Sequence, residues 1–102
     1  MHYLLMYDFT PDYLGRRGAY REAHLRAAWA AQGRGELILG GALTDPADMG
    51  VLLFKSDSPR VAEAFAAADP YVVHGLVTRW RVRQWNTVVG EQAAAPVRVD
   101  QS

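Results

Sequence analysis

Apolar and polar positions divide the first third of the chain into a strand and a helix. Residues 2–8 are apolar on both alternating faces, which is typical of a strand covered on both sides. An alanine-rich stretch with scattered arginines and no internal proline predicts one long helix over residues 14–32, ended by Gly33 and Gly35. One stripe of this helix carries Tyr20, His24, Ala27, Ala28 and Ala31.

The middle of the chain predicts a hairpin followed by a second helix. Residues 36–42 and 50–54 have consecutive apolar positions and are separated by a turn that contains proline, so they predict two paired strands. Ser58 and Pro59 form a helix-start signal, with Ser58 as the N-cap and Pro59 at the first helical position. This helix is expected to end before Asp69, because a residue that precedes proline disfavours the helical conformation.

The last regular element is predicted to be a strand after a short turn or helical bend at residues 71–75. Over residues 76–88 apolar side chains alternate with arginines, which makes one face mostly apolar and the other strongly cationic. Residues 89–102 have no hydrophobic period and are expected to form a flexible or partner-hugging tail. The sequence therefore predicts a single domain over residues 1–88.

The order strand, helix, strand, strand, helix, strand predicts an α+β domain of the ferredoxin-like split βαβ type (βαββαβ). In this arrangement both helices cover one face of an antiparallel sheet. The other face would carry leucine, isoleucine and tyrosine side chains of the first three strands, a larger apolar patch than monomers usually expose. We therefore predict a homodimer in which two sheets pack face to face.

Composition narrows the classes of function. The chain of 102 residues has no cysteine, which excludes disulfides, thiolate zinc sites and a cysteine nucleophile. The formal net charge of zero argues against nucleic-acid binding and against attraction to an anionic membrane. The N-terminal apolar run is too short for a signal sequence or a membrane span, so a cytoplasmic location is expected.

His24 and Asp69 are the residues most suited to chemistry. A helix residue and the end of the other helix can meet in this fold, and a carboxylate can fix the tautomer of an imidazole that acts as general acid and base. Two structural interpretations stay open. His24 could be a core histidine satisfied by one hydrogen bond, and Asp69 a turn former that bonds the backbone two residues on.

Other candidates carry weaker signals. His74 could replace His24 as the partner of Asp69 or add a second base, and it could equally be an exposed turn residue. Tyr7 or Tyr71 could donate a hydrogen bond to a developing oxyanion. No histidine spacing typical of a metal site is present, so no metal is predicted. The arginines of the last strand could bind anions or nucleic acid, or could be solvated charges at a sheet edge: Arg79, Arg81 and Arg83.

Three segments of the chain resemble the YciI-like, or YCII-related, family of small bacterial proteins. They are Arg21-x-x-His24-Leu25, Gly35-x-Leu37 leading into Gly40-Gly41, and Asp69-Pro70-Tyr71-Val72-x-x-Gly75. The resemblance implies a dimeric α+β barrel of ferredoxin-like halves, with a His–Asp pair in an active-site cleft that corresponds here to His24 and Asp69. Family members often have a longer polar segment between the second and third strands than this chain.

The resemblance also implies a class of reaction. Assigned members resemble cofactor-free enzymes of aromatic-ring degradation, including dehalogenation and lactone or muconate chemistry. We therefore expect a cofactor-independent acid–base enzyme of the lyase, hydrolase or isomerase type, acting on a small oxygenated, aromatic-derived substrate. Expected substrate-binding residues are Tyr7, Arg21, Tyr71 and His74. The alternative is a non-catalytic dimeric module that binds a small ligand or serves as an accessory protein.

Overall fold

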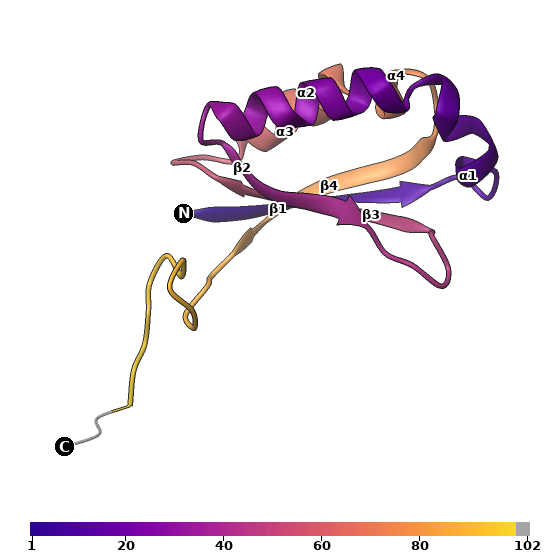
Figure 1. Cartoon of the computed structure of the whole chain (residues 1–102). Coiled ribbons are helices and arrows are strands. Elements are labelled where there is room, and N and C mark those ends of the chain that lie inside the picture. The colour runs from indigo at the N-terminus through magenta and orange to yellow at the C-terminus, as the bar shows by residue number, and fades with distance from the viewer. Residues whose placement is uncertain (100–102) are drawn as a thin grey trace.

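The computed structural model describes residues 1–99, which fold as a four-stranded antiparallel sheet with helices on one face (Figure 1). The elements, in chain order, are β1 (His2–Phe9), α1 (Tyr13–Arg16), the 3₁₀ turn η1 (Arg17–Ala19), α2 (Arg21–Gly33), β2 (Leu37–Ala42), β3 (Met49–Lys55), α3 (Arg60–Ala68), α4 (Pro70–Val73) and β4 (Val77–Trp85). This order confirms the predicted α+β arrangement.

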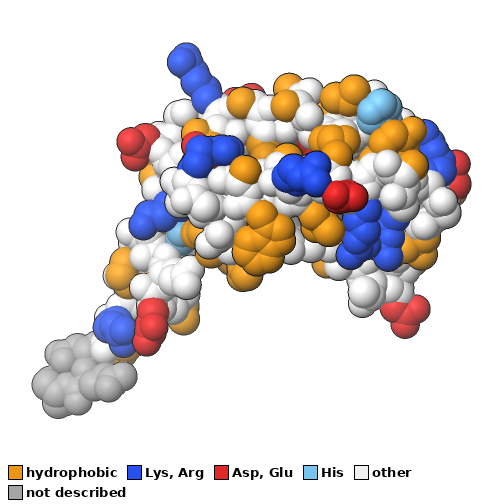
Figure 2. Space-filling model, turned by 45° about the horizontal axis from the view of Figure 1, so that its top comes forward, with side chains coloured by type: hydrophobic (Ala, Val, Ile, Leu, Met, Phe, Trp, Pro, Cys, Tyr) orange, Lys and Arg blue, Asp and Glu red, His pale blue; other side chains and the backbone are white. Residues whose placement is uncertain are grey.

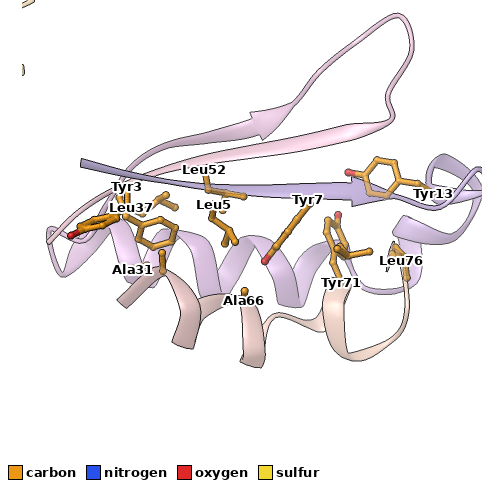
Figure 3. Close-up of a cluster of buried hydrophobic side chains, with 13 residues drawn as sticks. Tyr3, Leu5, Tyr7, Tyr13, Ala31, Leu37, Leu52, Ala66, Tyr71 and Leu76 are labelled. Carbon is orange, nitrogen blue, oxygen red and sulfur yellow. The ribbon is translucent and has the colours of Figure 1, made fainter. Parts of the chain in front are cut away.

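The strands lie in the order β2-β3-β1-β4, which places β1 in the middle and β4 at an edge. Tyr3, Leu5 and Tyr7 of β1 point toward the helices and are buried. They stand opposite Phe54, Leu52 and Gly50 of β3, respectively. Figure 3 shows this core between the sheet and the helices, with Leu5, Tyr7 and Tyr71 directed into it. The central strand therefore presents every second side chain to the space where the two helices meet.

The C-terminal end of α2 has the geometry that its glycines predict. Gly35 has a positive φ of 78°. Its amide donates to the Gln32 carbonyl at 2.9 Å, and the Glu36 amide donates to the Ala31 carbonyl at 3.0 Å. This pair of bonds is the Schellman arrangement, which satisfies the last carbonyls of a helix and favours glycine at the left-handed position. The turn directs the chain into β2, which runs antiparallel to β3 as predicted.

The prediction of one helix over residues 14–32 was wrong. The chain forms α1, then η1, and begins α2 only at Arg21, after Tyr20 leaves the helical region with φ −121° and ψ −4°. Gly15 and Gly18 lie within this stretch, and each lowers helical stability by about 1 kcal/mol relative to alanine. The break separates the segment that carries Tyr13 and Arg17 from the helix that carries His24.

Two predicted boundaries and one predicted strand face also need correction. The last strand ends at Trp85 instead of residue 88, where Trp85 pairs with His2, the first residue of β1. In the sequence pattern of the last strand, Val77 shares the alternating face of the arginines. In the structure it is buried where the register of β1 and β4 shifts. The second helix begins at Arg60, one residue late, while the Ser58 hydroxyl accepts from the Arg60 amide at 3.3 Å.

The segment after β4 folds back on itself near the N-terminus. The Thr87 hydroxyl lies 2.6 Å from Nδ1 of the buried His2 and accepts from the Ala94 amide at 2.8 Å. Burial lowers the pKa of His2, and the positive charges of the N-terminal amine and Lys55 act in the same direction. The hydrogen bond between the His2 ring and the Thr87 hydroxyl ties this segment to β1. Residues 100–102 of the expected tail lie outside the described residues.

Within residues 1–99, no helix is both long and apolar enough to cross a membrane.

Candidate active site

His24 and Asp69 meet between the two long helices. Nδ1 of His24, on α2, lies 2.8 Å from Oδ1 and 2.9 Å from Oδ2 of Asp69. Asp69 occupies the junction between α3 and α4, where it is the N-cap of α4. The two residues are 45 positions apart in the chain, and the packing of both helices on one sheet face brings them together.

Asp69 is buried completely and its carboxylate is surrounded by donors. Besides His24, it accepts from the Tyr7 hydroxyl at 2.7 Å and from the Tyr71 amide at 3.0 Å. The hydrogen bond from the Tyr71 amide is the local turn bond expected of an aspartate before proline. Asp69 therefore stabilises the turn and holds His24 at the same time. A buried carboxylate needs this set of donors, because an unpaired charge in the interior is costly.

The carboxylate determines which nitrogen of His24 carries a proton. An ionised carboxylate only accepts hydrogen bonds, so the neutral imidazole that faces Asp69 holds its proton on Nδ1. The other nitrogen, Nε2, has no hydrogen-bond partner among residues 1–99. His24 therefore has a free lone pair on the side of the ring opposite Asp69.

Aromatic rings hold the imidazole in this orientation. The ring of His24 stacks on Tyr71 with 3.9 Å between centroids and 9° between planes. Phe65 meets its edge at 6.5 Å. Tyr71 in turn contacts Tyr13 edge to face at 5.7 Å, and Tyr13 stacks on Phe9 at 3.7 Å. This chain of rings restricts rotation of His24 beyond what its bond to Asp69 imposes.

A cleft of about 490 Å³ opens beside His24. Its walls come from η1 and α2 on one side and from β2 on the other, with β1 and β3 below. Its volume lies within the range of small-molecule sites. His24 lines the cleft, whereas Asp69 lies behind it with no exposed side-chain surface. The His24 ring is thus accessible to a ligand, and the Asp69 carboxylate is shielded from solvent.

Both tyrosines near the pair stay protonated at neutral pH. Burial is the main cause that raises the pKa of Tyr7, and the charge of Asp69 and the hydrogen bond to it act in the same direction. Burial, followed by the neighbouring Tyr13, raises the pKa of Tyr71 to about 12. Tyr7 therefore donates a hydrogen bond to Asp69 and orients the carboxylate, so its hydroxyl is not free to donate to an oxyanion.

The structure brings most of the predicted site residues together. Tyr7, Arg21, His24 and Tyr71 line the cleft. His74 does not line it and instead stacks on Tyr20 at 4.3 Å between centroids. Among residues 1–99, no group of three histidine or acidic side chains is placed to hold a metal ion.

Sequence reasoning missed several cleft residues, which are Phe9, Tyr13, Arg17 and Trp29. The sequence did contain one signal for the face of the helix that lines the cleft. Arg21, Leu25, Ala28 and Gln32 follow the i, i+4, i+7 and i+11 spacing of a single helix face, and all four line the cleft. Tyr13 and Phe9 offered no comparable signal, because their contact depends on the break between α1 and α2.

Replacing Tyr7 by phenylalanine is expected to lower the free energy of unfolding by about 1–3 kcal/mol, because it removes a donor from a fully buried carboxylate. Chemical denaturation measures this change. Tyr3→Phe is the matched control on the same face of β1, since the Tyr3 hydroxyl contacts only a methionine sulfur at 4.0 Å. Equal losses in the two variants would contradict the assigned role of Tyr7.

The chain is similar to one known family of proteins. No curated protein matches the chain. Among solved structures, the chain is similar to 5-chloro-2-hydroxyhydroquinone dehydrochlorinase from Burkholderia phenoliruptrix AC1100, solved in complex with 2,5-dihydroxybenzoquinone. The TM-score is 0.71 at 24% sequence identity, over 85% of this chain and 95% of that chain. This likeness confirms the fold. The YCII-related domain matches residues 1–86, and the chain belongs to that family.

Proposed function

We propose that this protein is a cofactor-independent enzyme that uses His24 as general base and acid on a small oxygenated ring compound. The observation that carries the proposal is the position of His24 between a buried carboxylate and an accessible cleft. The similar solved structure belongs to a dehydrochlorinase and holds a dihydroxybenzoquinone, which supports a hydroxylated ring as the substrate class.

The proposed step begins with a ring hydroxyl directed at Nε2 of His24. The proton moves to Nε2, and the oxygen keeps the electron pair. Asp69 stabilises the imidazolium that forms, as the aspartate of a catalytic triad does. The ring oxygen becomes a carbonyl as the ring carbon that bears the leaving group takes the proton from His24. Loss of a proton from a second ring hydroxyl to solvent then expels a group such as chloride with its bonding pair and leaves a quinone, so that HCl is lost and no oxidant is needed.

The test is turnover of 5-chloro-2-hydroxyhydroquinone by the purified chain, without added cofactor and under anaerobic conditions that suppress autoxidation. We expect chloride release above the rate in buffer. The non-chlorinated parent, 2-hydroxyhydroquinone, distinguishes dehalogenation from other chemistry at the ring. Binding of such compounds without any turnover would instead assign the chain as a ligand-binding module.

We also propose that the chain forms a homodimer, and the open face of the sheet supports this. Side chains that alternate with the buried ones point away from the helices, including Leu4 and Met6 of β1 and Val51 and Leu53 of β3. Leu39 of β2 lies beside them and is 70% exposed. A second copy of the sheet would cover this apolar face.

Sedimentation velocity at micromolar concentration is expected to give a species with twice the 11.3 kDa mass of the chain. Leu53→Glu places a charge in the centre of the open face and is expected to produce monomers with the same secondary structure. A wild-type chain that sediments only as the monomer would contradict the dimer.

A further inference from the structure

The charged side chains that line the cleft beside His24 are all basic. Of the residues that line it, Arg17 and Arg21 are cationic and none is acidic. The remaining lining is aromatic, aliphatic or glycine, apart from the polar side chains of His24, Gln32 and Thr44. In Figure 2 basic side chains are spread along the molecule, with one group at the end that carries α1 and the start of α2. A ligand in this cleft therefore meets a positive field that protein carboxylates along its walls do not neutralise.

Neither arginine has a carboxylate partner within the described part of the chain. Arg16, Arg26 and Arg34, from the same stretch, each lie between 2.7 and 3.7 Å from an acidic side chain. Arg17 and Arg21 form no such ion pair among residues 1–99. Within this stretch, the two arginines that form no ion pair are therefore the same two that line the cleft.

Helix stability does not explain Arg21. It is the first residue of α2, and the N-terminus of a helix carries a partial positive charge that favours acidic side chains and disfavours cations. Arg17 is held differently, with its guanidinium 5.6 Å from the centroid of the Tyr13 ring. That ring lines the cleft, so the contact keeps the charge of Arg17 against the cleft wall.

Both charges lie in the same cleft as His24. Arg21 precedes His24 by three residues on α2, which places the two side chains on one helix face. The guanidinium groups of Arg21 and Arg17 oppose the effect of burial on the pKa of Tyr71, whose ring stacks on His24. A ligand that presents a hydroxyl to Nε2 can therefore place a second oxygen near the two arginines.

The rest of the cleft suits a flat ring. The half-buried Phe9 and the 69% exposed Trp29 line the cleft with aromatic side chains. Gly40 of β2 pairs with the buried Leu52 and has no side chain, which leaves room opposite α2. A planar ligand with an anionic edge would match both the apolar surfaces and the charge.

We propose that Arg17 and Arg21 form an anion-binding subsite, and that the substrate is a planar ring compound carrying an ionised oxygen group beside the hydroxyl that His24 deprotonates. This inference rests on the proposed function for the role of His24. The anionic group is a ring carboxylate or an ionised ring hydroxyl of an acidic quinone. The guanidinium groups also stabilise the negative charge left on the ring oxygen when its proton moves to Nε2, so they favour that transfer.

Calorimetric binding tests the subsite without relying on turnover. The probes are 2,5-dihydroxybenzoate, its uncharged methyl ester, and 2,5-dihydroxybenzoquinone, which is ionised at neutral pH. We expect at least one ionised probe to bind about tenfold more tightly than the ester, as one charge-assisted hydrogen bond provides. The ionised probe with the higher affinity identifies the anionic group, and added salt is expected to weaken its binding.

Arg17→Gln and Arg21→Gln are each expected to remove most of this preference and its salt dependence. Arg60→Gln is the matched control, because Arg60 is also the first residue of a helix, has no ion pair among residues 1–99 and lies outside this cleft. Equal affinities for charged and uncharged probes would overturn the subsite, as would weak binding of both ionised probes or equal effects of all three substitutions. Failure of the proposed function has a different signature, in which ionised probes bind as expected and no ring compound is turned over.

Discussion

Replacing His24 by glutamine is expected to lower kcat by about 10²–10⁴-fold while the affinity for 2,5-dihydroxybenzoquinone changes little. Glutamine can still hydrogen-bond to Asp69, but its amide cannot take up a proton, so the contribution of a general base is lost. The helix and its packing are preserved, because His24 is half-buried and glutamine is a good helix former. Steady-state turnover and calorimetric binding measure the two effects separately.

His74→Gln is the informative comparison for this variant. The sequence left open whether His74 rather than His24 serves as the base, and in the structure His74 stacks on Tyr20 and does not line the cleft. We expect His74→Gln to retain most of the turnover. A loss in His74→Gln as large as the loss in His24→Gln would contradict the assignment of His24.

The architecture could be predicted from the sequence because its determinants are local. Runs of consecutive apolar residues mark the strands, and Gly35, Ser58 and Pro59 mark helix boundaries within one residue or two. The break before α2 was missed because two glycines in an alanine-rich stretch are compatible with either a continuous or an interrupted helix. The choice depends on tertiary contacts, such as the stacking of Tyr13 on Phe9.

In the candidate site, too, some contacts could be predicted from the sequence and others depend on long-range packing. The meeting of His24 and Asp69 followed from helix positions in a known topology, so the sequence could predict it. The bond from Tyr7 to Asp69 spans 62 residues and depends on which face of β1 turns toward the helices. Because all of the residues from Tyr3 to Tyr7 are apolar, alternation could not identify that face. The fit of Phe9 over Gly50, where an added Cβ would lie 2.8 Å from the ring, was equally beyond local reasoning.

Replacing Asp69 by asparagine is expected to lower kcat by about 10²–10⁴-fold and to leave the fold intact. The asparagine oxygen can keep the bond to the Tyr71 amide, and the Tyr7 hydroxyl can turn to accept from the new amide group. The substitution removes the negative charge that stabilises imidazolium, and an amide facing Nδ1 favours the tautomer with its proton on Nε2, which can no longer act as base. Turnover and thermal denaturation of the same preparation measure both consequences.

A double variant tests whether Asp69 acts through His24. If Asp69 acts through His24, then His24→Gln combined with Asp69→Asn is expected to be no slower than His24→Gln alone, because residues that work as one unit are not additive. Asp57→Asn makes the same chemical change at an exposed loop position and controls for the loss of a negative charge. If the fold-losses in kcat of the two single variants multiply in the double variant, Asp69 contributes independently of His24. A fall in thermal stability that accompanies and accounts for the loss of both binding and turnover would mean that the pair serves mainly to hold the two helices together.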